Sequence, residues 1–287
     1  MRSLVLGATG IVGGYIVQHL VLSGERPFAL SRSPPKDPTG AQWVSGDLAD
    51  PAALKLPQIE TIYCTVQVDL LAEALPYLLN PSLKRIVAFS STSIVTKIDS
   101  ELKSERESMT ALAEAEQKLI ATCERLRIGW TILRPTIIYA EGRDRNVTRL
   151  ARLIQTFGVL PLAGRGSGLR QPVHAEDLAI GALNAAAQEA AINKIYVLPG
   201  RDIISYREMV GRIFDGLQKP RRIISVPPIL WRLAFLLAKP FLPNATVAMG
   251  SRMAKDMVFD GLPATRDFNW NPREFRPRFE GKVQRDH

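Results

Sequence analysis

Residues 3–13 read SLVLGATGIVG and decide the fold of this chain. The short apolar run 3–6 is typical of a buried strand, and it ends at the first of three glycines, Gly7, Gly10 and Gly13. Beyond the turn, apolar and amphipathic residues recur at three- and four-residue spacings, which predicts one face of a helix (Ile11, Val12, Tyr15, Ile16, His19 and Leu20). The pattern therefore predicts a strand, a glycine turn and a helix in succession.

Such a turn has a direct chemical use. Glycine permits a tight turn and lets the backbone approach a pyrophosphate, while the helix N-terminus offers free N–H groups and a positive dipole end. The residues expected to contact a dinucleotide here are Gly7, Thr9, Gly10, Ile11, Val12 and Gly13. A purely structural glycine turn is the alternative.

Further strands and helices alternate along the chain. Strand-like runs are expected at residues 27–30, 42–44, 59–66, 84–90, 129–133 and 195–198, with a helix at about 109–125. Strands that alternate with helices build a parallel sheet through right-handed crossovers. The sequence thus predicts an α/β fold: a Rossmann-type doubly wound parallel sheet with a smaller C-terminal region.

Composition narrows the class of protein. The chain has 287 residues, 46% of them hydrophobic and 23% charged, which is typical of a globular protein and not of a disordered one. Two cysteines cannot build a disulfide framework, and with only three histidines no zinc site is expected. The N-terminal residues lack the pattern of a secretory signal, so we expect a cytoplasmic location.

The formal net charge of +9 is concentrated toward the C-terminal end. Residues 1–200 hold 21 Lys and Arg against 19 Asp and Glu, whereas residues 201–287 hold 16 against 9. A basic end can meet nucleic acid, anionic lipid or a phosphorylated substrate, or can simply be a solvated surface. No nucleic-acid-binding motif is present, so we expect no nucleic-acid partner.

Several downstream motifs continue the pattern begun by GATGIVGG. They are SGDL (45–48), FSSTSIV (89–95), LRPTIIYAEGRD (133–144), RQPVHAEDLA (170–179) and YVLPGRDIISYREM (196–209). In order and spacing these motifs resemble the short-chain dehydrogenase/reductase superfamily, in its extended and atypical branch of epimerases, dehydratases and reductases. The resemblance covers roughly residues 3–215. It implies an NAD(P)-binding domain over 1–140 and a substrate-binding region over 141–287, parts of which return to the sheet.

The end of the second strand selects the cofactor in this superfamily. An acidic residue there would bind the ribose hydroxyls of NAD, but this sequence has Ser31 and Arg32. A guanidinium suits a 2′-phosphate, so the sequence favours NADP(H) over NAD(H). The resemblance also places Asp47 and Leu48 on the adenine side, although an aspartate after a strand is often only a helix cap. Pro135 is likewise carried over as a cofactor contact.

The catalytic residues are where this chain departs from the superfamily. A tyrosine and a lysine four residues apart normally move the proton, with a serine or threonine that binds the reacting oxygen. Thr92 takes the place of that serine or threonine, with Ser91 as the alternative. The tyrosine place falls on Ser108 and the lysine place on Leu112, and no Y-x-x-x-K occurs anywhere in the chain. This departure puts ordinary alcohol–ketone redox chemistry in doubt, but not cofactor binding.

The later part of the chain holds weaker candidates. The resemblance places four arginines in loops that grip a substrate diphosphate: Arg143, Arg145, Arg165 and Arg170. Surface arginine is the alternative for all four. His174 is expected to be structural and Asp177 to anchor the next helix. Tyr139 is expected to pack, with a role as substitute acid as the alternative.

The segment from Val226 to Pro243 is the most apolar in the chain. It is too short and too broken by proline, Arg232 and Lys239 to span a bilayer. We expect a buried helix, and the alternative is an interfacial helix that makes peripheral membrane contact and suits a lipid-linked substrate.

Two functional hypotheses follow. The first is an NADP(H)-dependent oxidoreductase or epimerase that acts on a nucleotide sugar or related ketone. The second is a nucleotide-binding accessory or sensor protein without turnover, similar to the accessory subunit of respiratory complex I. The missing tyrosine and lysine favour the second, and the retained Thr92 and the loop arginines favour the first.

Overall fold

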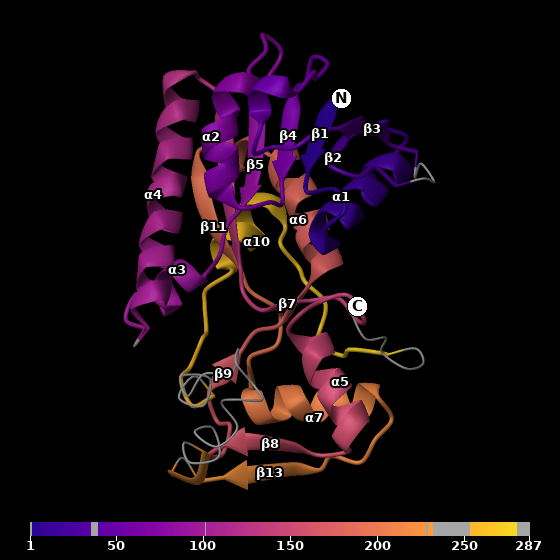
Figure 1. The fold of residues 1–287 in the computed structure, drawn as a ribbon, viewed down its shortest axis with the longest axis vertical. Helices are drawn as coiled ribbons and strands as arrows, with labels where there is room; N and C mark the ends of the chain where they lie inside the picture. Colours follow the sequence, from indigo (N-terminus) through magenta and orange to yellow (C-terminus); the bar gives the residue numbers. More distant parts are fainter. Residues whose placement is uncertain (1, 36–39, 101, 228, 232–252, 280–287) are drawn as a thin grey trace. The chain divides into compact units, whose positions relative to one another are not determined.

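The computed structural model describes residues 2–35, 40–100, 102–227, 229–231 and 253–279 (Figure 1). The chain divides into two compact units. Unit 1 comprises residues 1–136, 175–198 and 260–271, and unit 2 comprises residues 137–174, 199–259 and 272–287. The chain therefore leaves unit 1 and returns to it twice.

Unit 1 is built on a seven-stranded sheet in the order β3-β2-β1-β4-β5-β6-β11, and every neighbouring pair is parallel. The strands are β1 (Ser3–Leu6), β2 (Phe28–Ser31), β3 (Gln42–Ser45), β4 (Thr61–Cys64), β5 (Arg85–Phe89), β6 (Gly129–Pro135) and β11 (Lys194–Leu198). This order confirms the Rossmann-type doubly wound sheet. Strands β1, β4 and β5 are buried at every position, which explains their continuous apolar runs.

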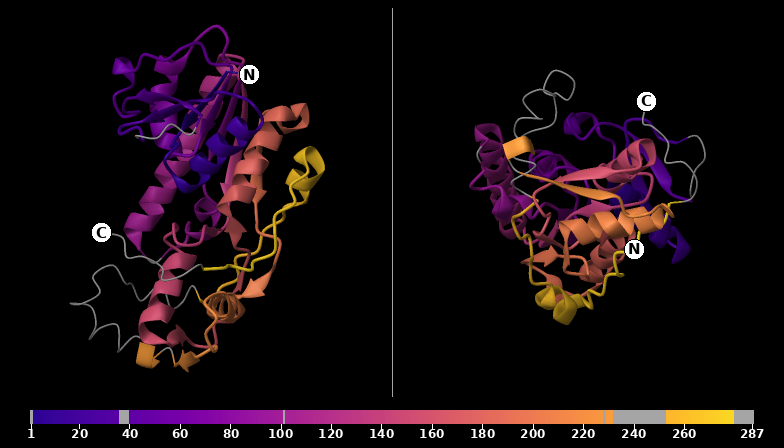
Figure 2. Two further views of the ribbon diagram at one scale, coloured as in Figure 1. Left: turned by 90° about the vertical axis from the view of Figure 1, so that its right-hand side faces the viewer. Right: turned by 90° about the horizontal axis from the view of Figure 1, so that it is seen from below.

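Helices cover both faces of this sheet, as Figures 1 and 2 show. Helices α1 (Ile11–Leu22) and α6 (Ala175–Ala187) pack together on one face. Helices α2 (Val68–Leu78) and α4 (Lys103–Arg125) pack together on the other. A short helix, α10 (Leu262–Phe268), packs on α6 and β11, so a late part of the chain completes unit 1. The remaining short elements are η1 (Pro51–Ala53), α3 (Ser93–Thr96) and η2 (Glu189–Ala191).

Two helices differ from the sequence prediction. Helix α4 begins at Lys103, six residues before the predicted start, because residues 103–108 read KSERES and carry no apolar period to reveal a helix. Helix α2 was not predicted. Its apolar residues form a nearly continuous run that contains Pro76, and such a run hides a 3.6-residue period.

Unit 2 has its own core, formed where α5 (Val147–Phe157) and α7 (Tyr206–Gly216) pack together. Three pairs of short strands surround the helices: β7 (Ile138–Tyr139) with β10 (Val173–His174), β9 (Leu169–Arg170) with β12 (Ile204–Ser205), and β8 (Leu160–Ala163) with β13 (Ile223–Val226). Ser205 caps α7, because its hydroxyl accepts a hydrogen bond from the N–H of Glu208 at 3.0 Å.

The apolar segment 226–243 lies largely outside the described residues, which include only 226–227 and 229–231 of it. Within those residues Ile229 and Leu230 are exposed, at 80% and 54%. No helix in the described part of the chain is long and apolar enough to cross a membrane. Across the same described ranges, no group of three or more histidine, cysteine, aspartate or glutamate side chains is placed to hold a metal ion.

Candidate functional site

The glycine turn lies at the point where the sheet of unit 1 reverses its strand order. From β1 the chain runs to β2 on one side, and later to β4 on the other. The carboxyl ends of β1 and β4 therefore lie at the switch point, the place at which open α/β sheets bind their ligands.

At Gly7 and Gly13 the turn leaves no room for a side chain. Gly7 has a φ of +81°, and a Cβ there would lie 2.5 Å from Oγ1 of Thr65. A Cβ on Gly13 would lie 2.2 Å from the carbonyl oxygen of Gly7, so helix α1 sits directly on the turn. The Thr65 hydroxyl is within hydrogen-bond distance of the carbonyls of Leu6 (3.1 Å) and Gly7 (3.2 Å), to which it donates. The turn is thus fixed from both sides.

The N-terminus of α1 is open to a ligand. Gly10 is the N-cap and is exposed, and no side chain in the described chain caps the helix. The first turn carries no acidic residue, and the first N–H groups of a helix have no acceptors within the helix. Uncapped N–H groups beside an exposed glycine fit the pyrophosphate of a dinucleotide.

The residues expected at the adenosine end follow the next two strands. Arg32 is exposed and follows β2, while the Ser31 hydroxyl accepts a hydrogen bond from the N–H of Ser33 at 3.1 Å. After β3, the Asp47 carboxylate accepts from the N–H of Ala49 at 3.0 Å, as a local turn requires. Leu48 is buried in the core of unit 1, so its side chain has a packing role.

The two candidate hydroxyls after β5 differ in what they bind. Thr92 is 8% exposed, and its hydroxyl donates to the carbonyl of Pro135 at the end of β6, at 2.9 Å. The proton of Thr92 is therefore used to hold two neighbouring strand ends together. The Ser91 hydroxyl accepts from the N–H of Ser93 at 3.0 Å, an interaction that does not use its proton.

Helix α4 contains no tyrosine, and no tyrosine occurs between Tyr77 and Tyr139. Ser108 is exposed, and its hydroxyl donates to the carbonyl of Ser104 within the same helix at 2.7 Å. Leu112 packs against the core of unit 1. Neither residue offers an acid or a cation.

One turn further along α4 lies a charge that the sequence motifs did not predict. Glu116 has no exposed surface, and the guanidinium of Arg134 on β6 binds both of its carboxylate oxygens, with Nε at 3.1 Å from Oε1. A paired fork of this kind fixes both spacing and orientation, so the ion pair sets how α4 lies on the sheet. Its sequence signal is a glutamate at an otherwise apolar position of the helix face.

In unit 2, His174 and Tyr139 belong to one packed cluster. The Tyr139 ring is 1% exposed and meets the rings of His174 and Phe275 edge to face, with centroids 5.0 and 4.9 Å apart. His174 Nε2 lies 3.3 Å from the Glu141 carboxylate. Burial alone would raise the pKa of Glu141, but hydrogen bonds from His174 and backbone N–H groups lower it overall.

The four arginines carried over as substrate residues fall into two groups. Arg143, Arg145 and Arg165 are exposed in loops of unit 2. Arg170 is 3% exposed, donates to the carbonyls of Leu169 and Lys255 at 2.7 Å, and lies 5.6 Å above the Tyr206 ring. Burial lowers the pKa of Arg170, and the contacts engage its guanidinium within unit 2.

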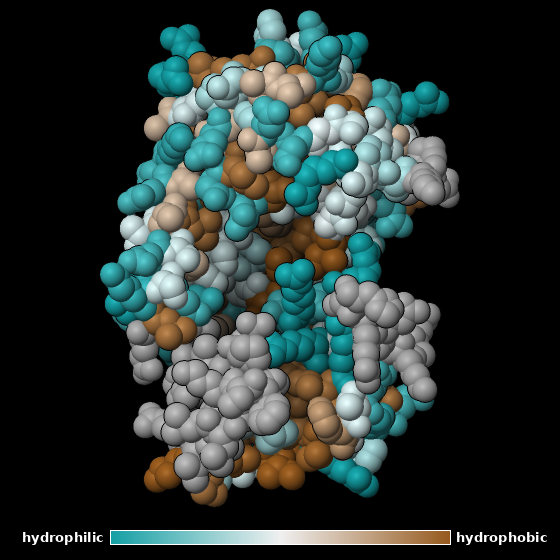
Figure 3. Space-filling view, in the orientation of Figure 1, coloured by the Kyte–Doolittle hydropathy of each residue, from teal (hydrophilic) through white to brown (hydrophobic). Residues whose placement is uncertain are grey.

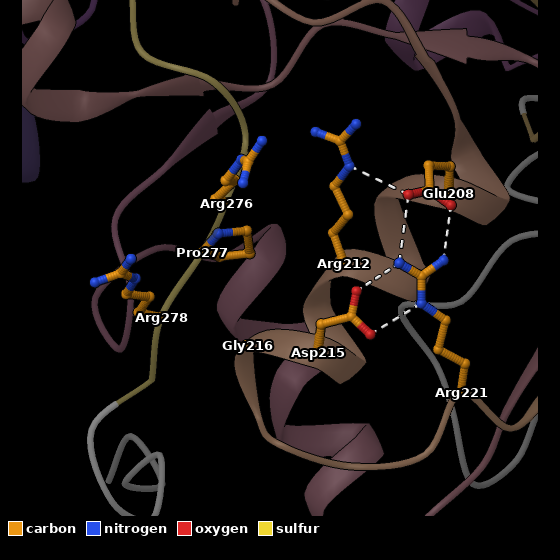
Figure 4. Close-up of a pocket in the computed structure, with 8 residues that line it drawn as sticks. All are labelled: Glu208, Arg212, Asp215, Gly216, Arg221, Arg276, Pro277 and Arg278. Carbon is orange, nitrogen blue, oxygen red and sulfur yellow. Dashed lines mark hydrogen bonds and ion pairs between the residues drawn. The ribbon is translucent and has the colours of Figure 1, made fainter.

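A cavity of about 380 Å³ in unit 2 holds other arginines (Figure 4). It is lined by Glu208, Arg212, Asp215, Gly216, Arg221, Arg276, Pro277 and Arg278. Arg221 bridges Glu208 at 2.8 Å and Asp215 at 2.9 Å, and Arg212 pairs with Glu208 and Asp202. Carboxylates match both Arg212 and Arg221, so this side of the cavity is an ion-pair network.

The chain was compared with known proteins by sequence and by fold. No protein-family model matches the chain. UDP-glucose 4-epimerase of Vibrio cholerae is 24% identical over 263 residues, which cover 80% of each chain. Subunit 9 of the NADH dehydrogenase 1 alpha subcomplex, a mitochondrial protein of Arabidopsis thaliana, is 25% identical over 246 residues. That match covers 78% of this chain and 60% of the relative.

Solved structures agree in fold. An epimerase from Methanothermobacter thermautotrophicus has a TM-score of 0.73 at 17% identity, and covers 96% of this chain and 88% of its own. MoeE5, solved in complex with UDP-glucuronic acid and NAD, has a TM-score of 0.70 at 19% identity, with 96% and 94% covered. Together with the two sequence matches, these folds confirm the resemblance to the extended short-chain dehydrogenase/reductase superfamily.

Thr65 is a residue of the site that the sequence motifs did not predict. It holds the glycine turn from the side of β4, through its hydroxyl. A signal for it was present in the sequence, because Thr65 stands directly after β4, which pairs with β1. A polar residue at the end of that neighbouring strand is well placed to contact the turn that follows β1.

Proposed function

We propose that this chain binds a nicotinamide dinucleotide in unit 1 and does so without the acid–base pair that drives rapid turnover. The observation that carries the proposal is the glycine turn with its uncapped helix, set at the switch point of a seven-stranded parallel sheet. The proposed contacts are those expected from the sequence: Gly7, Thr9, Gly10, Ile11, Val12, Gly13, Ser31, Arg32, Asp47, the backbone at Leu48, and Pro135. In this superfamily the bound nicotinamide would supply hydride transfer.

The proposed cofactor is NADP(H) in preference to NAD(H). Arg32 is exposed directly after β2, where a carboxylate would be needed to bind the ribose hydroxyls of NAD. A guanidinium at that place attracts a 2′-phosphate and offers paired donors to its oxygens. The neighbour MoeE5 was solved with NAD, so the preference depends on Arg32 and not on the likeness in fold.

The proposal of slow or absent turnover rests on Ser108 and Leu112. A serine hydroxyl that donates within its own helix is too weak an acid to replace an activated phenol, and a packed leucine supplies no charge. Positioned acid–base catalysis contributes about two to four orders of magnitude in rate. The match to subunit 9 of the NADH dehydrogenase 1 alpha subcomplex supports an accessory or sensor role for this chain.

A slow oxidoreductase or epimerase that acts on a nucleotide sugar is the second candidate. It is favoured by the match to UDP-glucose 4-epimerase over 80% of both chains. Ser91 would then be the group that polarises the carbonyl, because the Thr92 proton is given to Pro135. The exposed loop arginines Arg143, Arg145 and Arg165 would provide the contacts to a diphosphate.

Calorimetric titration with NADPH and NADH tests cofactor binding and preference. Wild type is expected to bind NADPH more tightly, and Arg32→Asp to reverse the order. Arg26→Asp is the matched control, because Arg26 is also exposed and stands just before the same strand, β2, at its amino end. Failure of wild type to bind either dinucleotide overturns the proposal, and an unchanged ratio in Arg32→Asp overturns the role of Arg32.

Turnover is tested separately, with UDP-glucose, UDP-glucuronic acid and simple ketones as substrates. Clear dinucleotide binding with very slow conversion is expected. Turnover at the rate of an ordinary reductase would show that another acid operates and would favour the second candidate. A gain of activity in the double variant Ser108→Tyr, Leu112→Lys would support the assignment of these two places.

A further inference from the structure

The end of unit 2 formed by β8 and β13 combines exposed apolar side chains with basic ones. Strands β8 and β13 pair in parallel, with Ile224 opposite Pro161, and both residues are exposed on the same face of this two-stranded sheet. Ile224 is 55% exposed. The other face packs on the core of unit 2, to which Leu160 and Leu162 belong. The sheet thus has a buried face and an uncovered apolar one.

Exposed apolar side chains also lie just before β8 and just after β13 along the chain. Phe157, the last residue of α5, is 69% exposed and lies three residues before β8 begins. Ile229 and Leu230 follow β13 and are 80% and 54% exposed. Figure 3 shows brown, apolar residues gathered at the end of unit 2 where β8 and β13 run. Exposed large apolar side chains that cluster in this way mark an interaction surface.

Basic residues border the same side chains. The carbonyl of Arg222, an exposed residue, accepts from the N–H of Leu160, so this arginine lies beside the start of β8. Lys219 donates to the carbonyl of Gln155 at 3.2 Å, next to the end of α5. Arg207 bonds the Ser225 hydroxyl at 3.0 Å on β13. Arg221 is nearby in sequence but is engaged by Glu208 and Asp215, so it adds little net charge.

The sequence around both strands contains no acidic residue. Residues 145–175, which include β8, hold five arginines and no aspartate or glutamate. Residues 216–255, which include β13, hold seven lysines and arginines and again no acid. Residues 176–215, between these two stretches, hold six acidic residues against four lysines and arginines. Positive charge beside exposed aliphatic and aromatic side chains complements an anionic membrane, which has negative headgroups at its surface and apolar acyl chains beneath them.

We propose that the β8–β13 end of unit 2 is a docking surface for anionic lipid membranes. In this arrangement Ile224, Ile229, Leu230 and Phe157 enter the interface between headgroups and acyl chains. Arg222, Lys219 and Arg207 meet the lipid phosphates, with their aliphatic stems along the apolar surface. The contact is peripheral and reversible, and it is independent of dinucleotide binding in unit 1.

Cosedimentation of the full chain with vesicles tests this proposal. Vesicles of phosphatidylcholine with 30% phosphatidylglycerol, an amount chosen as roughly that of a strongly anionic membrane, are compared with phosphatidylcholine alone. Binding is expected only to the anionic vesicles, with partial release when salt shortens the screening length. Absence of binding to anionic vesicles at low salt overturns the proposal.

Two variants and a matched control locate the surface. Ile224→Asp is expected to weaken vesicle binding about tenfold, because it removes apolar burial and places a carboxylate among phosphates. Arg222→Glu is expected to weaken it about tenfold or more, since each charge near such a surface contributes about a fivefold factor and the change spans two. Ile203→Asp is the control, because Ile203 is 54% exposed in the same unit but lies outside both acid-free stretches.

The outcomes separate the proposal from its competitors. Equal loss in Ile224→Asp and Ile203→Asp overturns the assigned surface, as does retention of full binding in Ile224→Asp. A third outcome concerns a short duplex DNA added as competitor. If the DNA removes all vesicle binding, and Ile224→Asp binds the DNA as well as wild type does, the surface is a polyanion site and the membrane proposal is overturned. Self-association that disappears in Ile224→Asp without any vesicle binding assigns the surface to a second copy of the chain. Thermal melts of each variant verify that the fold is intact.

Discussion

Gly10 and Gly13 lie three residues apart in the same turn, but the physical reason for glycine differs between these two positions. A Cβ on Gly13 would lie 2.2 Å from the Gly7 carbonyl oxygen, against ordinary contacts of 3.4 Å or more, so helix and turn would have to separate by about 1.2 Å. A Cβ on Gly10 would lie 3.1 Å from the same oxygen, which asks for a shift of about 0.3 Å. Gly10 has φ −75° and ψ 168°, which any residue adopts.

Gly13→Ala is therefore expected to damage the fold. Overpacking against rigid backbone costs about 1–3 kcal/mol and occasionally more, so we expect about 3 kcal/mol and a melting temperature lower by about 5–10 °C. Gly10→Ala is expected to cost less than about 1 kcal/mol, mainly through the poorer N-cap. Its methyl group would instead stand over the uncapped N–H groups and weaken NADPH binding about tenfold to a hundredfold, the value of one hydrogen bond to a charged group.

Calorimetric titration and thermal melts of both variants check this separation. Gly24→Ala is the control: its φ of +86° makes alanine strained, but no atom lies within 4 Å, so it lowers stability without touching the turn. We expect NADPH binding to survive in Gly24→Ala. Wild-type affinity in Gly10→Ala would refute the placement of the pyrophosphate, and wild-type stability in Gly13→Ala would refute the packing argument.

Three further predictions concern stability and reactivity. Glu116→Gln is expected to lower the free energy of unfolding by about 3 kcal/mol in chemical denaturation, because it leaves the Arg134 cation without its anionic partner. Glu114→Gln is the control: Glu114 is an exposed residue of α4, and its substitution should change the free energy of unfolding little. Burial raises the pKa of Cys64 and Cys123 to about 12. Neither thiol should therefore react with an aromatic disulfide reagent at pH 8 until denaturant is added. Prompt reaction of either thiol in the native protein would contradict its burial. Because the pKa of Glu141 is lower in the fold than its ordinary value of 4.5, its ionised form stabilises unit 2 above that pH and the gain is lost as pH falls below it. Acid unfolding followed by tryptophan fluorescence should therefore be less steep in Glu141→Gln, while Glu274→Gln, on an exposed carboxylate, should match wild type.

The sequence could predict those features of the fold that depend on short-range sequence patterns. The turn at Gly7–Gly13 and the strands of the parallel sheet have short-range signals, because a strand buried on both faces reads as an apolar run. The start of α4 at Lys103 has no such signal. Nor does the return of residues 260–271 to unit 1, where Trp270 packs so closely on α6 that a Cβ at Gly181 would lie 2.7 Å from its ring. That contact joins residues about ninety positions apart, and no local pattern records it.

The candidate site divides in the same way, and the division bears on function. Residue type and spacing suffice to place a hydroxyl near the end of β5, but they do not say where its proton goes. Thr92 gives its proton to Pro135 and so stabilises the join between β5 and β6, whereas the contact of Ser91 with Ser93 uses only its oxygen. A group that polarises a carbonyl must donate to the substrate, so the more buried hydroxyl is the poorer candidate even though the superfamily motif points to it. If Ser91 also proves dispensable for any turnover, both hydroxyls serve the strand ends alone. Unit 1 would then be a dinucleotide-binding domain in which α4, the helix that carries Ser108 and Leu112, serves only in packing.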